Sequence, residues 1–474
     1  MANLGGAVAI LLGVFALGTC AAAAAAAEDA PFVRVSPRDA RYFELSDGRP
    51  YIPIGLNMVE VPWGSKDISG MEAWMKSLAA NRGNFIRVWL SSRFFDIENA
   101  KSGQYNEDQA RHIDELLAIA RKHNIRLKLT IEHFRVFDGS SWANKPLHLV
   151  ANGGPAENVA DFFDGPRSRE QFKRKLAWYA ARCGSDPTVF GWELWNEVNC
   201  VGGGDWMAWT DVMLAELHRL FPRNLCVQSL GSFDGDWARK HYPKMMTLPG
   251  NDVAQVHRYL DLGAPYKVCH GPVDVLAADA VREVLAMNPK RPVLLAESGA
   301  VEPRHTGPFK LYKADKDGII LHDVLFAPFF AGAAGPGHIW HWDHYVSPNN
   351  LWWHFGRFAA VVEGIDPPAE AFEVLEPPHA TLRVRALKGK RTFLAWIRDP
   401  QNTWQTELAE GRPPARVAGA SLKLPDGLPA LDAATVRTYD PWTDRWAPAR
   451  VSGGEVALPE FARSIVVRID WPAR

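Results

Sequence analysis

FGWELWNE (residues 190–197) is a mostly apolar run that ends in the carboxylate of Glu197. PVLLAESG (residues 292–299) is a second such run, and it carries Glu297 near its end. Short apolar runs predict buried strands, and a charge at the end of a buried strand needs a reason. In a barrel of parallel strands, the loops at the C-terminal rim converge over a pocket. We therefore expect Glu197 and Glu297 to face each other across a catalytic rim.

Strand-like and helical patterns alternate along the chain from Phe32 onward, which is typical of a parallel α/β architecture. The expected strands are 51–57, 84–90, 126–133, 190–197, 225–229, 253–259, 292–299 and 337–342, and the expected helices are 71–80, 108–122, 169–182, 205–220, 274–287 and 321–330. Eight strands predict a (β/α)8 TIM barrel over residues 31–366 rather than an open doubly wound sheet. No Gly-rich phosphate loop follows any of them, which argues against a nucleotide-binding fold.

The pattern changes after residue 366. Short alternating strands at 382–385, 392–397, 435–439 and 464–469 are separated by turn residues, as at Asp426-Gly427. We expect a small C-terminal antiparallel β-sandwich over residues 372–474. Because it carries no cluster of carboxylate, His or Cys residues, we interpret it as support for the barrel, with carbohydrate attachment as the alternative.

The N-terminus has the pattern of an export signal. Residues 7–17 are apolar but too few to span a bilayer, and residues 21–27 supply small side chains for cleavage. We expect a signal peptide at 1–27, no membrane span, and a secreted or periplasmic protein.

Four cysteines remain after the expected cleavage. They could form disulfide bonds or stay as small buried side chains, and they are Cys183, Cys200, Cys226 and Cys269.

Charge and aromatic content favour a neutral partner. The chain has 53 basic and 54 acidic side chains, so it lacks the basic surplus that nucleic acid or an anionic membrane would attract. It has 19 Trp, whose flat apolar face and single N–H suit sugar rings, although many of these must be core residues. We expect a monomer that acts on a carbohydrate substrate without a cofactor or metal.

Two opposed carboxylates can hydrolyse a glycosidic bond with retention when they lie roughly 5 Å apart. We assign Glu197 as the general acid/base and Glu297 as the nucleophile. The charge of Glu297 would raise the pKa of Glu197, which then holds the proton it must donate. Once Glu297 is glycosylated its charge disappears, and Glu197 can act as a base.

The pattern resembles the clan A glycoside hydrolases, and within them the cellulase-like family 5. The residues that carry the resemblance are Asn196-Glu197, Glu297, His257-Arg258-Tyr259, Arg87, and Trp340 or Trp342. The resemblance covers about 51–342 and implies retaining hydrolysis of β-linked, cellulose- or mannan-type chains. Val198 and Ser298 depart from it, where family 5 commonly has Pro and an aromatic residue, which leaves the subfamily and the sugar open.

The resemblance also implies individual roles. Asn196 would hydrogen-bond the substrate 2-hydroxyl, Tyr259 would orient Glu297, and Arg87 would keep Glu297 ionised. The remaining residues would form the substrate site, with His133 and His257 lining the pocket and Trp340 or Trp342 stacking beneath the sugar.

Other interpretations remain open at this stage. Arg87 could instead neutralise Glu193, an acid deeper in the barrel. The histidines His338, His341, His344 and His354, with Asp343, could hold a catalytic metal. The chain could also be a carbohydrate-binding protein without catalysis. The loop 137–163 could close one end of the cleft and thereby favour exo cleavage.

Overall fold

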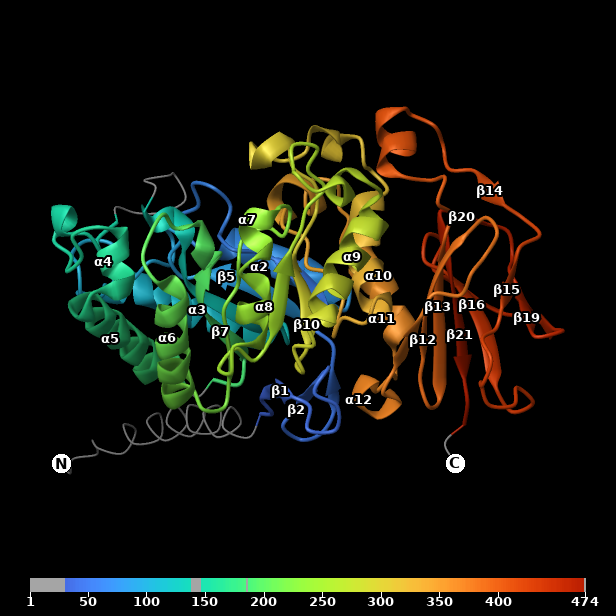
Figure 1. The fold of residues 1–474 in the computed structure, drawn as a ribbon, viewed down its shortest axis with the longest axis horizontal. Coiled ribbons are helices and arrows are strands. Elements are labelled where there is room, and N and C mark those ends of the chain that lie inside the picture. Colours follow the sequence, from blue (N-terminus) through green and yellow to red (C-terminus); the bar gives the residue numbers. More distant parts are fainter. Residues whose placement is uncertain (1–29, 138–145, 185, 473–474) are drawn as a thin grey trace, which may run out of the picture.

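The computed structural model describes residues 30–137, 146–184 and 186–472 (Figure 1). The expected signal peptide at 1–27 lies outside the described residues, as does part of the loop 137–163. None of the helices in the described ranges has the length and apolar character needed to cross a membrane.

Seven parallel strands form two sheets. The first sheet has the order β4 (Gly55–Asn57), β5 (Phe85–Trp89), β6 (Arg126–His133), β7 (Val189–Asn196) and β8 (Leu225–Val227), and the second pairs β9 (Ala254–His257) with β10 (Val293–Glu297). All side chains of β5, β7 and β10 are buried. Burial on both faces is what their continuous apolar runs predicted.

Backbone hydrogen bonds connect the two sheets at both ends. At one end, Asp252 N donates to Cys226 O at 3.0 Å, and Phe233 N donates to His257 O at 2.7 Å. At the other end, the segment around Ile339 bridges the strands, because Ser298 pairs with Ile339 and Asn57 N donates to Ile339 O at 3.0 Å. These bonds link the segments that flank β8 and β9, and they link the Ile339 segment to the ends of β10 and β4.

The strand expected at 337–342 is the main error in the predicted element series. Only an isolated bridge at Ile339 is present, and the chain then enters the short turn η7 (Trp342–Val346). The Asn57 side chain contacts this region, because its Nδ2 donates to Ala296 O at 3.0 Å and His338 O at 3.2 Å.

Helices cover the outside of the parallel strands (Figure 1). The helices that precede the C-terminal sheets are α2 (Ser69–Ala80), α3 (Glu107–Lys122), α4 (Val159–Asp164), α5 (Pro166–Cys183), α6 (Trp206–Leu220), α7 (Asp236–Arg239), α8 (Tyr242–Thr247), α9 (Val273–Ala286), α10 (Ile319–Phe330), α11 (Trp353–Val362) and α12 (Pro367–Glu370), of which α12 contacts the C-terminal part. Each helix predicted from the sequence is present. Every residue of α10 is buried, because the helix lies between α9 and the C-terminal strands that it contacts.

A small antiparallel sheet precedes the parallel strands and was not predicted. It consists of β1 (Val33–Val35), β2 (Phe43–Leu45) and β3 (Pro50–Tyr51). The expected strand 51–57 is split, because β3 pairs with β2 whereas β4 pairs with β5, and Pro53 between them lacks an N–H for a ladder. Phe43 packs edge-on against Phe190 with ring centroids 5.2 Å apart, so the sheet covers the strand ends opposite Glu197.

The C-terminal part consists of antiparallel sheets, as the change in pattern predicted. The largest has the order β11 (Glu373–Leu375), β12 (Arg383–Lys388), β13 (Thr392–Arg398), β21 (Ser464–Asp470), β16 (Thr435–Asp440) and β17 (Arg445–Pro448). Two smaller sheets contain β14 (Arg416–Val417) with β20 (Phe461–Ala462), and β15 (Ser421–Lys423) with β19 (Glu455–Ala457) and β18 (Val451–Ser452). Buried ion pairs tie the largest sheet to the helices, including Arg398 Nε to Asp323 Oδ1 at 3.0 Å.

Candidate active site

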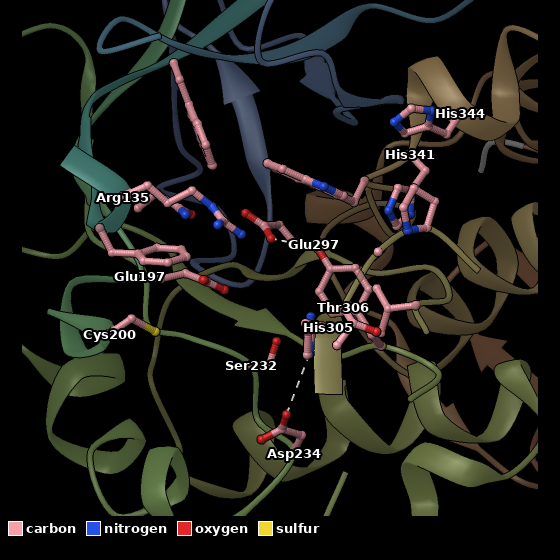
Figure 2. A pocket seen from close by; sticks show the side chains of 18 of the residues that line it. Arg135, Glu197, Cys200, Ser232, Asp234, Glu297, His305, Thr306, His341 and His344 are labelled. Carbon is pink, nitrogen blue, oxygen red and sulfur yellow. Dashed lines mark hydrogen bonds and ion pairs between the residues drawn. The ribbon is translucent and has the colours of Figure 1, made fainter. Parts of the chain in front are cut away.

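Glu197 and Glu297 project into one cavity at the C-terminal ends of β7 and β10 (Figure 2). Glu297 is the last residue of β10, and Glu197 follows β7 directly with a positive φ of 54°. The turn at Glu197 is stabilised because its N–H donates to Ser229 Oγ at 3.2 Å. A carboxylate oxygen of each glutamate and Nδ1 of His257 lie within 4.8 Å of one another. A separation of the two carboxylate oxygens below this limit is compatible with the roughly 5 Å between the carboxyl groups of retaining glycosidases.

Arg87 contacts both the interior acid and the carboxylate at the rim. Its Nε donates to Glu193 Oε2 at 2.7 Å, its Nη1 pairs with Glu297 Oε1, and its Nη2 donates to Asn196 Oδ1 at 2.6 Å. Burial acts against ionisation of Glu193, but the charges of Arg87 and Lys128 nevertheless lower its pKa to about 2. The two alternatives for Arg87 are therefore not exclusive, since one guanidinium serves both acids.

The two cavity glutamates differ in their surroundings. Burial raises the pKa of both carboxyl groups, and the charge of Glu297 raises the pKa of Glu197 further. The pKa of Glu297 is pulled back down by Arg87 and by the Tyr259 hydroxyl, which donates to its Oε2 at 2.7 Å. The pair therefore releases its first proton from Glu297, while Glu197 keeps its own.

His257 lies between the two glutamates and carries no charge. Its Nδ1 is 2.9 Å from Glu197 Oε1 and 3.5 Å from Glu297 Oε2. Burial, together with the charges of Arg87 and Lys128, lowers the pKa of His257 well below its usual value. A neutral imidazole at this position hydrogen-bonds Glu197 without adding a positive charge that would favour its ionisation.

The cavity has a volume of about 460 Å³. Of the predicted site residues, Asn196, Glu197, Tyr259, Glu297 and Trp340 line it. The other four lie behind these residues. They are Arg87 and His257, with the contacts given above, His133, whose Nδ1 is 2.7 Å from Ser91 Oγ, and Trp342, which packs edge-on against Trp74 at 6.3 Å.

Several residues of the cavity wall were not predicted. They are Trp89, Phe134, Arg135, Cys200, Ser232, Asp234, Trp237, Val301, His305, Thr306, Gly307 and Pro308, whereas His341, Asp343 and His344, which also line the cavity, had been considered as metal ligands. Trp89 ends β5, so the strand-end argument that selected Glu197 could have found it. Most of the others lie in irregular loops, which leave no periodic signal in the sequence.

The histidines considered as metal ligands do not converge. His338 Nε2 donates to Pro53 O at 3.1 Å, and His354 Nε2 donates to Asp317 O at 2.8 Å. His341 Nδ1 is 3.2 Å from the Tyr312 hydroxyl. Among the described residues, the sets whose donor atoms could meet at one cation are Glu197–His257–Glu297, Asp234–Asp261–His305 and His218–Cys226–Asp252.

The four cysteines of the described chain are unpaired, and three of them are buried. Of the two interpretations of the cysteines, the structure therefore agrees with small buried side chains rather than disulfide pairs.

Parallel strands with two opposed carboxylates at their C-terminal rim define a glycoside hydrolase that cleaves O-glycosyl bonds. The chain belongs to glycosyl hydrolase family 5, because the family model described as cellulase (glycosyl hydrolase family 5) matches residues 46–316. The resemblance seen in the sequence is thus confirmed, and the protein is a retaining β-glycoside hydrolase.

Relatives with known names agree with this assignment. Mannan endo-1,4-beta-mannosidase 7 of Arabidopsis thaliana is 26% identical over 389 residues, which cover 73% of this chain and 83% of the relative. Putative mannan endo-1,4-beta-mannosidase 9 of Oryza sativa subsp. japonica is 25% identical over 288 residues, which cover 53% of this chain and 68% of the relative.

Solved structures show the same fold at low sequence identity. A chain titled glycoside hydrolase superposes with a TM-score of 0.60 and 13% identity, covering 94% of this chain and 97% of that one. A putative glycoside hydrolase from Bacteroides vulgatus ATCC 8482 gives a TM-score of 0.58 and 16% identity, covering 94% of this chain and 83% of that one. The coverage shows that the likeness extends into the C-terminal sheets.

Proposed function

We propose that the protein hydrolyses β-1,4-linked mannan or its oligosaccharides by double displacement, with Glu297 as the nucleophile and Glu197 as the acid/base. The observation that carries the proposal is the pair of carboxylates within 4.8 Å, of which only Glu297 is also bound by Arg87 and Tyr259. The names of the plant relatives support mannan as the substrate.

In the first step, ionised Glu297 attacks the anomeric carbon of the sugar. The bond between that carbon and the leaving-group oxygen breaks, and Glu197 gives its proton to this oxygen. The products are a glycosyl ester on Glu297 and the released part of the chain, whose leaving oxygen is now a hydroxyl group. Burial and the Glu297 charge keep Glu197 protonated until this moment, which is what a general acid requires.

In the second step, the loss of the Glu297 charge lowers the pKa of Glu197. Glu197 now takes a proton from water, the water oxygen bonds to the anomeric carbon, and Glu297 leaves as a carboxylate. Two inversions at one carbon restore its original configuration. The pair is ready for another cycle, because the proton is again on Glu197.

Neighbouring side chains orient these groups. Arg87 has only donors, so Asn196 must turn its oxygen toward Arg87, and its NH₂ can then donate to the sugar 2-hydroxyl. Trp340 lines the cavity with its ring 5.1 Å from that of Trp89, and these two rings offer an apolar wall for the sugar undergoing cleavage. Arg87, His257 and His133 act from behind the wall as positioning residues.

The architecture that carries the site is part of the proposal. The eight strand positions would form one closed (β/α)8 barrel within residues 31–366, and the sheets of residues 372–474 would form a β-sandwich that supports it. Hydrogen bonds at both junctions between the parallel sheets support closure. Residues 1–27 would be removed as a signal peptide, which gives a secreted or periplasmic monomer.

A panel of soluble β-1,4-mannan, cellulose and xylan substrates tests the proposal, with product sugars measured by chromatography. We expect mannan to be cleaved fastest, and Glu297→Ala to lose activity by at least about 10³-fold. Glu197→Ala should lose roughly 10²- to 10⁴-fold on these substrates. With an activated aryl β-glycoside, whose leaving group departs without a proton, added azide should restore turnover of this variant and yield a β-glycosyl azide. Glu363→Ala, which removes a surface carboxylate paired with Arg82, is the control. Full activity in the Glu297 variant would contradict the assignment.

A further inference from the structure

We propose that Asp234, Asp261 and His305 bind one Zn²⁺ ion at the rim of the cavity, where the ion would hold three loops together. These residues lie in the loops that follow β8, β9 and β10. One donor atom from each lies within 4.8 Å of the other two, and Asp234 and His305 also line the cavity. The inference does not depend on which sugar is cleaved, because neither of the catalytic glutamates would be a ligand.

One carboxylate oxygen in this set lacks a hydrogen bond although it is buried. Asp261 is only 1% exposed, and its Oδ2 has no hydrogen-bond partner among the described residues. Nε2 of His305 is 3.7 Å from this oxygen, which is too far for a hydrogen bond. A buried carboxylate oxygen without a hydrogen bond costs free energy. Its place beside an imidazole and a second carboxylate indicates that a cation binds there.

The other oxygen of each carboxylate is held in place by hydrogen bonds. Asp234 Oδ1 accepts from Nε1 of Trp237 at 2.8 Å. Asp261 Oδ1 accepts from the backbone N–H groups of Gly263 at 2.7 Å and Arg304 at 2.9 Å. Each Oδ2 then lies 3.7 Å from the same imidazole nitrogen. Hydrogen bonds to the ligand side chains orient them in metal sites in the same way.

The spacing of the donor atoms fits a small metal ion better than a direct ion pair. The separation of 3.7 Å between His305 Nε2 and Asp234 Oδ2, drawn in Figure 2, is longer than a charge-assisted hydrogen bond. In a tetrahedral zinc site with bonds of about 2.1 Å, two ligand atoms lie roughly 3.4 Å apart. One imidazole with two carboxylates suits Zn²⁺, whereas Ca²⁺ and Mg²⁺ are bound mainly by oxygen atoms.

The two other sets that could meet at a cation already use their donor atoms. In the set that contains Glu297, both oxygens of this carboxylate accept hydrogen bonds, from Arg87 and from Tyr259. In the set that contains Cys226, the backbone N–H of this residue donates to Asp252 Oδ2 at 2.7 Å. Within the described part of the chain, the proposed set is therefore the one of the three that has a buried carboxylate oxygen without a hydrogen bond.

The ion would stabilise the rim rather than take part in the reaction. It would neutralise two carboxylates that repel each other, and it would connect loops from three consecutive strands. A metal ion that binds the folded chain alone adds its binding free energy to the stability of the fold. Removal of zinc should therefore lower the melting temperature, while kcat/KM measured well below that temperature stays the same.

The test measures zinc binding by the whole protein. The protein is stripped with EDTA, dialysed, and titrated with Zn²⁺ in competition with a fluorescent chelator of known zinc affinity. Elemental analysis after removal of free zinc gives the number of ions per chain. We expect one Zn²⁺ per chain, and a melting temperature that rises by roughly 2–4 °C at saturating zinc.

Two ligand variants and one control locate the ion. His305→Gln should weaken zinc binding at least roughly 100-fold, since even the loss of a group that only orients a ligand costs up to about 100-fold. Asp261→Asn should have the same effect, and it keeps an oxygen for the two backbone N–H groups that hold this side chain. His344→Gln is the matched control, because His344 is another exposed histidine of the cavity wall, and its zinc affinity should equal that of the wild type. Melting curves without zinc check that each variant is folded.

Three results would overturn the inference. They are a wild type that binds no zinc, a His305→Gln variant that binds zinc as tightly as the wild type, and a zinc affinity that is lost in Glu297→Ala but kept in His305→Gln. The last result would place the ion between the catalytic glutamates. A wild type that is inactive on every glycan of the panel would instead refute the proposed function, and it would leave the zinc result standing, because no sugar is present in the titration.

Discussion

The Tyr259 hydroxyl donates a 2.7 Å hydrogen bond to Oε2 of Glu297, the oxygen that Arg87 leaves free. Burial and the Glu297 charge raise the pKa of Tyr259 well above its usual value, so the phenol remains a donor. This bond is one of the two contacts that distinguish Glu297 from Glu197. The division of roles between the glutamates therefore depends on it.

Tyr259→Phe tests that dependence. Loss of the hydrogen bond removes an interaction that favours the carboxylate, so the pKa of Glu297 rises and the acidic limb of the kcat/KM profile moves to higher pH. At the pH optimum, we expect kcat/KM to fall roughly 10- to 100-fold, since a hydrogen bond to a charged group is worth about 1.5–3 kcal/mol. The full pH–rate profile is the measurement. An acidic limb that does not move would show that Tyr259 does not control this ionisation.

Arg87→Met should destabilise the whole protein. The substitution leaves Glu193 and Glu297 buried without their main partner, and a broken buried pair costs about 3–5 kcal/mol. The free energy of unfolding in urea measures the effect. Arg111→Met is the control, because Arg111 pairs with Asp108 on the exposed surface of α3 and should change stability by at most about 1 kcal/mol. Equal losses in the two variants would refute the special position of Arg87.

Acid should destabilise the fold below the usual pKa of histidine. Burial lowers the pKa of His338 to about 3, although the hydrogen bond to Pro53 O opposes the shift. The folded state therefore binds fewer protons than the unfolded state between about pH 6.5 and 3, so stability falls as the pH falls through this window. In His338→Gln, the free energy of unfolding between pH 6 and 4.5 should depend less steeply on pH, by about 1.4 kcal/mol per unit.

A matched variant separates this effect from general titration. His344→Gln removes a largely exposed histidine, with 60% of its side chain accessible, and controls for the loss of one imidazole. A slope in His338→Gln equal to that of the wild type would contradict the assignment of His338 as a neutral buried group.

Treatment with EDTA should leave the hydrolysis rate unchanged. The proposed double displacement uses two carboxylates and no metal ion, and His338 and His354 each use Nε2 to donate to a backbone carbonyl. The measurement compares kcat/KM before and after dialysis against the chelator. Loss of turnover that one added divalent cation restores would favour the metal-dependent alternative, with Asp234, Asp261 and His305 as the first ligands to replace.

The helices and most strands could be predicted because each repeats a strong local signal. Continuous apolar runs marked β5, β7 and β10, and the 3.6-residue period marked helices such as α3. The segment around Ile339 has an equally apolar sequence, yet it makes only a bridge. The segment is surrounded by groups from elsewhere in the chain, such as the Asn57 amide, which donates to His338 O at 3.2 Å. No local pattern contains that contact.

The residues of the candidate site also fall into those that the sequence could predict and those that it could not. The sequence placed Glu197, Glu297, Asn196 and Tyr259 at strand ends, and the structure brings all four to one cavity. It could not choose between Trp340 and Trp342, because that choice depends on which ring packs against Trp74. Trp237 was missed because it lies in a helix of only four residues, and its exposure is a property of the folded chain.

The identity of the residue that carries the sugar is the most direct test of the central claim. The wild type is inactivated with a 2-deoxy-2-fluoro-β-glycosyl fluoride and digested, and the labelled peptide is sequenced by mass spectrometry. We predict a single adduct on Glu297. An adduct on Glu193 or Glu197, or hydrolysis that proceeds in Glu297→Ala with the wild-type rate, would contradict the account.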